Sequence, residues 1–411
     1  MTTKGKVVVI DNNDSNRQSL TELLEKEGYE VTSIADGDMG FLTVLKNRPS
    51  CVIIDTVLPG LDGLEISAKI RKESSLSQVK ILVHSEKPYD YDRRRAEAFG
   101  ADAFIPKPIK DKEEFIRKVN QLIQDDIFVE FWGVRGTLPV PGKNSIRYGG
   151  NTSCVSVEIP SAPLFVFDAG SGIRPLGDSI VPNRSFHLDA HIFISHSHWD
   201  HVNALPFFSP LYIPGNNITI SGPANLDISV DKMISDQMSS IYFPITVNEL
   251  GATISYQNLH QGHFEVGDVK VSTFLLRHPG NCLGYRLDYK GRSVSYITDN
   301  ELFPEQYPQY SKEYFESLAE FVQGTDILIT DSTYSENEYK SKVGWGHSCI
   351  PEVVKLAAEA KVKNYSLFHH DPCQTDDDID NKLEEAKVHM EKEKGDPDVC
   401  NAPQEGLKIK I

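Results

Sequence analysis

Cysteine is scarce in this chain and widely scattered. Six cysteines occur in 411 residues, and no two of them form a CxxC pair. This scatter disfavours a disulfide framework. The pattern is typical of buried thiols in a reducing compartment.

Long apolar runs and a leader segment are also missing. Soon after Met1 the chain enters an apolar segment, Lys6–Asp11, with no basic-then-apolar stretch before it. No apolar run approaches the roughly 18 residues that a membrane-spanning helix needs. We therefore expect a cytoplasmic protein with no membrane partner.

Basic residues are also few relative to acidic ones. The chain has 42 Lys and Arg against 59 Asp and Glu, for a formal net charge of −17. An acidic surface repels polyphosphate partners unless basic residues gather at one place. A broad nucleic-acid interface is thus disfavoured, whereas a pocket for a small anion is not.

Residues 1–124 alternate short apolar runs with amphipathic stretches, which predicts five strand–helix units. The expected strands are Val7–Ile10, Val31–Ile34, Cys51–Ile54, Ile81–Val83 and Ala103–Ile105, and the expected helices are Arg17–Glu27, Gly40–Lys46, Leu64–Arg71, Arg93–Phe99 and Glu113–Ile123. Such units predict a flavodoxin-like, doubly wound parallel sheet with its site at the carboxyl ends of the strands.

This segment resembles the receiver domain of bacterial response regulators over its whole length. The motifs that carry the resemblance are Ile10–Arg17, Cys51–Gly63 and Lys107–Pro108. The resemblance implies a phosphoacceptor, a Mg²⁺ loop, a switch hydroxyl, a switch aromatic and a lysine that neutralises phosphate. In that order these are Asp55, the pair Asp11 and Asn12, Ser85, Phe104, and Lys107.

One position departs from the receiver pattern. The family has two adjacent acids where this chain has Asp11 and Asn12, and losing one carboxylate weakens Mg²⁺ binding. Two interpretations follow. Asp55 accepts a phosphoryl group from a sensor histidine kinase or a small phosphodonor, or the module only docks or dimerises. We favour phosphorylation and expect a homodimer.

From residue 127 to 411 the pattern becomes strand-rich, with helices late in each portion. Examples are strands at Cys154–Ile159 and Ser293–Thr298, helices at Glu352–Ala360 and Ile379–Lys392, and a closing strand at Gly406–Ile411. Two sheets with helices outside is the expected architecture. The chain is therefore α/β overall, with domains at 1–124 and 127–411.

The segment His196–His201, HSHWDH, carries most of the chemical information. It places three imidazoles and a carboxylate within six residues, directly after the apolar run Ala190–Ser195. Neutral imidazoles and carboxylates are the ligands that Zn²⁺ and related dications accept. Packed this tightly at a strand end, they can hold two metals.

This half resembles the metallo-β-lactamase superfamily, an αββα sandwich, over nearly its full length. Phe131–Thr137 and Tyr148–Cys154 resemble the phosphodiesterase branch of that superfamily. The resemblance implies that His196, His198 and His278 bind one metal, that Asp200, His201 and His369 bind the other, and that Asp299 bridges them. His370 is the alternative to His369. A histidine at 198 favours Zn²⁺, or Mn²⁺, over a redox diiron pair.

Two further residues are candidates around the metals. Asp168 ends an apolar run and is expected to accept the free N–H of a ligating histidine, although Asp before Ala-Gly is also ordinary turn chemistry. His347 lies in a Gly-His-Ser loop like that of the branch, where it would protonate the leaving oxygen or hold phosphate; a helix-capping histidine is the alternative. Together with Asp200 and Asp299, His347 forms the expected catalytic set.

These observations predict a dinuclear-metal phosphodiesterase that uses a metal-bridging hydroxide and is regulated through Asp55. The span Leu205–Leu259 is compact and has no basic, glycine-rich arm, which favours a small substrate such as a cyclic nucleotide. The alternatives are a tRNA 3′-processing endoribonuclease and a receiver-linked sensing module without turnover.

Overall fold

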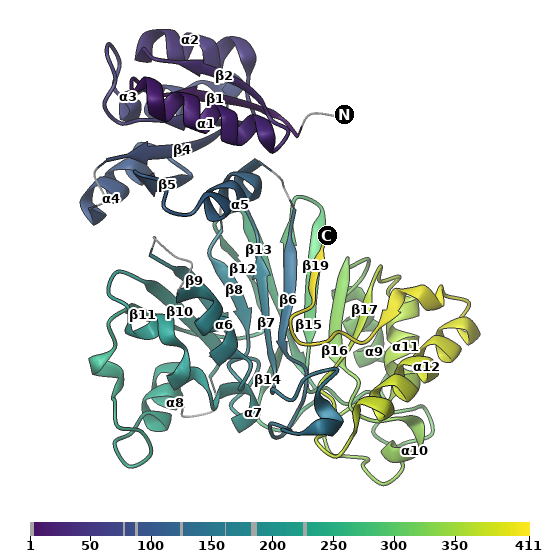
Figure 1. Ribbon diagram of the computed structural model, residues 1–411. Helices are drawn as coiled ribbons and strands as arrows, with labels where there is room; N and C mark the ends of the chain where they lie inside the picture. Colours follow the sequence, from purple (N-terminus) through teal and green to yellow (C-terminus); the bar gives the residue numbers. More distant parts are fainter. Residues whose placement is uncertain are drawn as a thin grey trace. The chain divides into compact units, whose positions relative to one another are not determined.

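The computed structural model describes residues 4–76, 79–86, 89–123, 126–160, 162–181, 187–224 and 228–411. The chain divides into two compact units, one ending at Asp126 and the next beginning at Ile127 (Figure 1). The division into domains at 1–124 and 127–411 stays a prediction. Within the described residues, no helix is both long and apolar enough to cross a membrane.

The N-terminal unit is a five-stranded, all-parallel sheet in the order β2-β1-β3-β4-β5, which confirms the expected doubly wound fold. Helices α2, α3 and α4 bury apolar side chains against one face, and α1 and α5 cover the other. The elements are β1 Lys6–Ile10, α1 Asp14–Lys26, β2 Glu30–Ile34, α2 Gly37–Asn47, β3 Cys51–Ile54, α3 Gly63–Lys72, β4 Lys80–Ser85, α4 Asp90–Ala98, β5 Ala103–Pro106 and α5 Lys112–Ile123.

The C-terminal unit contains two seven-stranded mixed sheets. Their orders are β11-β10-β9-β8-β7-β6-β19 and β12-β13-β14-β15-β16-β17-β18. The strands of the first sheet are β6 Phe128–Gly133, β7 Cys154–Glu158, β8 Leu164–Phe167, β9 Asp189–Phe193, β10 Asn217–Pro223, β11 Thr253–Leu259 and β19 Lys408–Lys410. Those of the second are β12 Gly262–Val266, β13 Val269–Leu276, β14 Cys282–Tyr289, β15 Arg292–Ile297, β16 Ile327–Asp331, β17 Tyr365–Phe368 and β18 Cys400–Asn401.

Helices flank this pair of sheets, as Figure 1 shows, so the expected αββα sandwich is confirmed. The helices are α6 Ile173–Ile180, α7 Trp199–Val202, α8 Val230–Gln237, α9 Lys312–Phe321, α10 Glu336–Tyr339, α11 Ile350–Glu359 and α12 Asp376–Lys392. Helices α6 and α8 pack on the outside of the first sheet, and α9, α11 and α12 pack on the second.

Stacked aromatic side chains join the two sheets from inside. The ring centres of Phe167 and Tyr296 are 4.9 Å apart and the rings are nearly parallel, and the ring centres of Phe193 and Tyr285 are 5.0 Å apart. All four side chains are buried, and burying each one contributes on the order of 2 kcal/mol. This core holds the ends of β8, β9 and β15 together, and the site residues follow directly from those ends.

Candidate metal centre

The HSHWDH segment leaves β9 and turns at once into the short helix α7. His198 precedes α7 as its N-cap, and its carbonyl accepts a hydrogen bond from the backbone N–H of His201 at 3.1 Å. The turn places the first two histidines before the helix and Asp200 with His201 inside it. Two separate ligand groups therefore arise from one hexapeptide.

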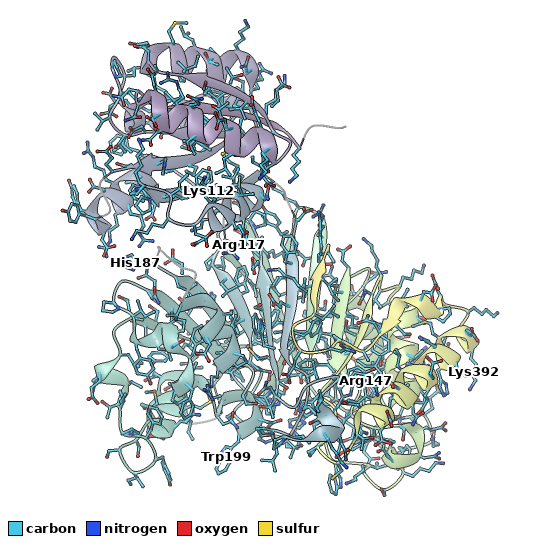
Figure 2. All side chains as sticks on the ribbon, in the orientation of Figure 1. Lys112, Arg117, Arg147, His187, Trp199 and Lys392 are labelled. Carbon is cyan, nitrogen blue, oxygen red and sulfur yellow. The ribbon has the colours of Figure 1, made fainter. Side chains whose placement is uncertain are left out.

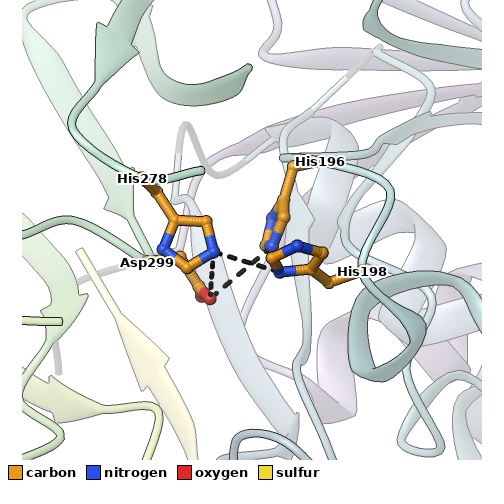
Figure 3. A group of neighbouring side chains, drawn as sticks. All are labelled: His196, His198, His278 and Asp299. Carbon is orange, nitrogen blue, oxygen red and sulfur yellow. Dashed lines mark hydrogen bonds and ion pairs between the residues drawn. The ribbon is translucent and has the colours of Figure 1, made fainter. Parts of the chain in front are cut away.

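The first group contains His196, His198, His278 and Asp299, whose ligand atoms all lie within 4.8 Å of one another (Figure 3). Nε2 of His278 lies 3.0 Å from Nδ1 of His198 and 3.6 Å from Oδ2 of Asp299. Nε2 of His196 is also 3.6 Å from Oδ2 of Asp299. Three imidazoles and one carboxylate oxygen thus converge on one point.

The second group contains Asp200, His201 and His369, again within 4.8 Å. Oδ1 of Asp299, the oxygen not used by the first group, lies 3.2 Å from Nε2 of His201 and 3.2 Å from Nε2 of His369. The two oxygens of Asp299 therefore face two different groups. This is the arrangement that a bridging carboxylate needs.

Two buried nitrogens in these groups have no hydrogen-bond partner. They are Nε2 of His196 and Nε2 of His201. Because Nδ1 of His201 is engaged by Asp168, its Nε2 presents a lone pair toward the carboxylates of Asp200 and Asp299. A divalent cation between them would satisfy nitrogen and oxygen together, so the residues present fit two metals with nitrogen and oxygen ligands.

The charge on Asp299 is supported by its neighbours. Burial alone would raise the pKa of this carboxyl, but the imidazoles of His369, His201 and His196 outweigh burial and hold that pKa well below its usual range. Asp299 is therefore a carboxylate, which is the form that binds a metal.

Asp168 holds one ligand in place from behind. Its Oδ2 accepts hydrogen bonds from Nδ1 of His201 at 2.7 Å, Oγ of Ser195 at 2.8 Å and the hydroxyl of Tyr296 at 2.7 Å. Oδ1 accepts the backbone N–H of Ser195 at 2.7 Å. In the first group, the Gly346 carbonyl lies 2.9 Å from Nδ1 of His278 in the same supporting role. Such partners fix the tautomer that leaves Nε2 free for a metal.

Three of these residues have left-handed backbone. The φ angles are 60° at Asp168, 45° at Asp299 and 61° at His369, at the ends of β8, β15 and β17. Side chains other than glycine adopt this region at a cost of order 1 kcal/mol each. The sharp turn at each strand end aims the side chain across the ends of the sheets and into the site.

The glycine-rich loop before α11 brings His347 to the same place. Its ring centre lies 4.9 Å from that of His369 and 5.2 Å from that of His278. Burial would lower the pKa of His347, but the adjacent carboxylates, Asp331 first, outweigh it and raise that pKa to about 9. Asp331, which ends β16 and lies 2.8 Å from Nδ1 of His347, was not among the residues predicted from the sequence.

A second acid that the sequence did not reveal shapes the same loop. The carboxylate of Glu301 is buried and accepts the backbone N–H groups of Gly344 at 2.7 Å and Gly346 at 2.8 Å. It also accepts the hydroxyl of Tyr339 at 2.8 Å. The loop that carries His347 is therefore anchored on both sides of Trp345.

The Phe131–Thr137 segment supports the second ligand group. The backbone N–H of Thr137 donates to Oδ2 of Asp200 at 2.7 Å, and Gly136 packs so closely on His369 that an added Cβ would lie 2.1 Å from the ring. His370, the alternative to His369, is turned away, with its Nδ1 2.9 Å from the ammonium of Lys382. The structure thus brings His369 into the group and leaves His370 outside.

The N-terminal unit gathers its expected residues at the carboxyl ends of its strands. The Lys107 ammonium lies 2.6 Å from Oδ2 of Asp55 and 2.8 Å from Oδ2 of Asp11. Burial would lower the pKa of Lys107, but its bonds to Asp11 and Asp55 outweigh burial and raise it. Oγ of Ser85 is 2.7 Å from the hydroxyl of Thr56, next to Asp55. Phe104 is buried and Asn12 is exposed.

Comparison with known proteins assigns each unit to a family. Residues 165–370, about half of the chain, match the family model of the β-lactamase superfamily domain, and residues 7–120 match that of the response regulator receiver domain. A solved metallo-β-lactamase fold protein, YhfI from Bacillus subtilis, is similar with a TM-score of 0.50 and 16% identity, covering 70% of this chain and all of that one. That likeness concerns the fold.

Curated relatives match the N-terminal unit. Protein PilH of Pseudomonas aeruginosa is 25% identical over 118 residues, which is 29% of this chain and 97% of PilH. The transcriptional regulatory protein SrrA of Staphylococcus aureus is 27% identical over 112 residues, which is 27% of this chain and 45% of SrrA. The chain thus spans less than half the length of SrrA.

Proposed function

Because this chain belongs to the β-lactamase superfamily and carries a response regulator receiver domain at its N-terminal side, we propose that it is a two-metal phosphodiesterase controlled by phosphorylation. The observation that carries the proposal is the position of Asp299, whose two oxygens face separate histidine groups at 3.2–3.6 Å. A carboxylate placed in this way can bridge two metals at the separation of about 3.5–4 Å that two-metal hydrolytic sites have.

The residues around the metals define the chemistry. Divalent cations, Zn²⁺ or Mn²⁺, held by the two groups would supply Lewis acidity toward water and toward the phosphoryl oxygens. His347, charged through Asp331, is placed to donate a proton from Nε2 to the departing alkoxide oxygen, because its Nδ1 is engaged by that carboxylate. Asp168 keeps His201 oriented throughout.

A small phosphodiester, such as a cyclic nucleotide, is the proposed substrate class. The net charge of −17 works against a long polyanion. A monoanionic diester can instead bind directly at the dication pair, where His198 is the exposed member of the ligand set. If the protein hydrolyses precursor tRNA instead, the proposal of a small substrate is wrong.

The receiver unit supplies the proposed control. Asp55 is the acceptor, Lys107 neutralises the incoming phosphoryl charge, and Ser85 is the hydroxyl that responds to it. Asp11 would hold Mg²⁺ beside them, and its pairing with Asn12 leaves one carboxylate fewer than the family pattern. The phosphoryl source is a sensor histidine kinase or a small phosphodonor, and a homodimer is the proposed assembly.

The test uses the full chain loaded with Zn²⁺ or Mn²⁺. Turnover is measured on bis(p-nitrophenyl) phosphate, on a panel of 3′,5′-cyclic nucleotides and on precursor tRNA, with and without acetyl phosphate and Mg²⁺. We expect cyclic-nucleotide turnover that changes with acetyl phosphate in the wild type and not in Asp55→Asn. Two bound metals with no turnover of any diester would overturn the enzyme proposal. Equal turnover rates with and without acetyl phosphate would overturn the proposal that the receiver unit regulates turnover.

A further inference from the structure

The side chain of Trp199 is exposed although its two neighbours in the chain belong to the ligand groups. It stands between His198 and Asp200, which belong to the two ligand groups, yet 81% of its surface is exposed. Figure 2 labels it at the lower edge of the C-terminal unit. A large aromatic side chain left in water at such a position is informative, because most indoles are largely buried.

The attachment of this indole is rigid although its ring faces water. The Trp199 carbonyl accepts the backbone N–H of Asn203 at 2.7 Å, and the His201 carbonyl accepts that of Ala169 at 2.7 Å. The residues on either side of Trp199 are held by the geometry of the ligand groups. The backbone that carries the indole is therefore fixed next to the ligand groups, so only the side-chain torsions of Trp199 remain to be ordered when a ligand binds.

Trp199 also lies on the open side of the site. His196 and His201 are fully buried, whereas His198, its immediate neighbour, is the exposed ligand. A substrate that reaches the ligand groups past His198 therefore meets the chain at the residue next to Trp199. The other exposed indole near the site, Trp345, already has the Lys342 ammonium 3.9 Å over its face. Among the described residues, no Lys or Arg side chain lies over the face of the Trp199 ring.

We propose that the Trp199 indole is a stacking surface for the base of a nucleotide substrate. This rests on the proposed function, because the ligand groups must take the phosphoryl group for the base to reach the indole. Stacking uses the face that every base has, so it selects nucleotides over diesters without a base and discriminates weakly between bases. Trp199 is then a specificity residue, with no part in the bond-breaking step.

Tryptophan fluorescence tests this directly, because the chain has three tryptophans. Trp132 is half-buried and donates to Oγ of Ser156 at 2.9 Å, so it serves as an internal reference. The metal-loaded full chain is titrated with adenosine 5′-monophosphate and, as the matched ligand without a base, ribose 5-phosphate. We expect only the first to quench, and we expect Trp199→Phe to lose the quench while Trp345→Phe keeps it.

Affinity gives the second readout. Trp199→Leu should weaken binding of adenosine 5′-monophosphate by about 5- to 100-fold, whereas Trp199→Phe, which keeps a ring, should lose much less. Binding of ribose 5-phosphate and the metal content should stay at wild-type values in both. The KM for cyclic nucleotides should rise with little change in kcat.

Contrary results fall into separate classes. If Trp199→Leu weakens both ligands equally, or neither, the stacking proposal is wrong. If diester turnover occurs without base dependence, the proposed function stands and the stacking surface fails alone. If the base-dependent quench persists in a protein that hydrolyses no diester, the stacking surface stands and the proposed function fails.

Discussion

The buried carboxylate of Asp331 and the half-buried imidazole of His347 form a pair, with Oδ2 of the carboxylate 2.8 Å from Nδ1 of the imidazole. The carboxylate also accepts the backbone N–H of Asn300 at 3.1 Å, and its Oδ1 accepts both the N–H and the hydroxyl of Thr333. The pair thus links the end of β16 to the loop before α11. Because Asp331 holds Nδ1, Nε2 is the nitrogen of His347 that would donate a proton in the proposed reaction.

Replacing Asp331 should impair leaving-group departure. In Asp331→Asn the His347 imidazole loses its strongest support for the charged form, and we expect kcat to fall by about 10- to 100-fold for alkyl diesters. Diesters of p-nitrophenol, whose leaving group needs no proton, should lose much less. If His347→Asn and the double variant show the same loss as Asp331→Asn, the two residues act together; additive losses would contradict the pairing.

Asp299→Asn should empty both metal positions. Asparagine tolerates the left-handed backbone at this position, so the variant tests charge without adding strain. We expect metal retention after dialysis to fall at both groups, because one oxygen faces each. His278→Ala is the matched comparison and should affect one metal. Metal-to-protein ratios measured by mass spectrometry decide between bridging and single-site roles.

Gly136→Ala should act on the second metal through His369. A Cβ at position 136 would lie 2.1 Å from the His369 ring, so the ring must move away from its group. We expect loss of about one metal per chain and of most turnover. Gly262→Ala is the control, since its Cβ would meet no atom within 4 Å. Equal metal content in the two variants would contradict the placement of His369.

The stability of the C-terminal unit should fall in acid through His191. Burial lowers its pKa to about 4, and Nε2 of this ring lies 2.7 Å from the Ser221 hydroxyl. The folded state disfavours the proton, so the contribution is present above the unfolded pKa and is lost as the pH falls from about 6.5 toward 4. By pH 5 the loss is about 2 kcal/mol.

The variant His191→Gln keeps a donor for Ser221 and has no titration in this range. The urea-unfolding midpoint of the C-terminal unit, followed from pH 7.5 to 5, should therefore fall less steeply in the variant than in the wild type. Parallel pH profiles for the two proteins would show that His191 does not contribute this dependence.

Asn12→Asp should strengthen Mg²⁺ binding in the receiver unit. Asn12 is exposed beside Asp11, so the added carboxylate meets no packed neighbour and restores the acid pair of the family. We expect about tenfold tighter Mg²⁺ binding and faster labelling of Asp55 by acetyl phosphate. An unchanged Mg²⁺ titration would mean that position 12 does not face the ion. Asp55→Asn is the negative control for labelling.

Much of the fold was accessible from periodicity, and the errors have physical causes. All five receiver strands lie within two residues of their expected ends, because four of the expected runs are short and apolar and the fifth, Val31–Ile34, is apolar at both ends. Strands β11 and β12 were not expected, since polar residues interrupt both and none of their residues is fully buried. The run Ala190–Ser195 was expected as one strand, but β9 ends at Phe193, where the chain turns toward the ligands.

Some residues of the candidate site could also be predicted from the sequence, and others could not. Ligand-type residues that follow apolar strands could be found from the sequence, and His196, His278, Asp299 and His369 meet in space. Asp331 and Glu301 could not be found, because each looks like an ordinary polar residue at a strand end. Their roles depend on a loop that comes about 15 to 45 residues later and folds back onto them.

The left-handed backbone at Asp168, Asp299 and His369 lowers the folding stability of the C-terminal unit. Glycine at any of the three would relieve strain and would also remove a ligand or its support. The three residues together therefore cost a few kcal/mol of folding free energy, and the same three turns aim their side chains into one site.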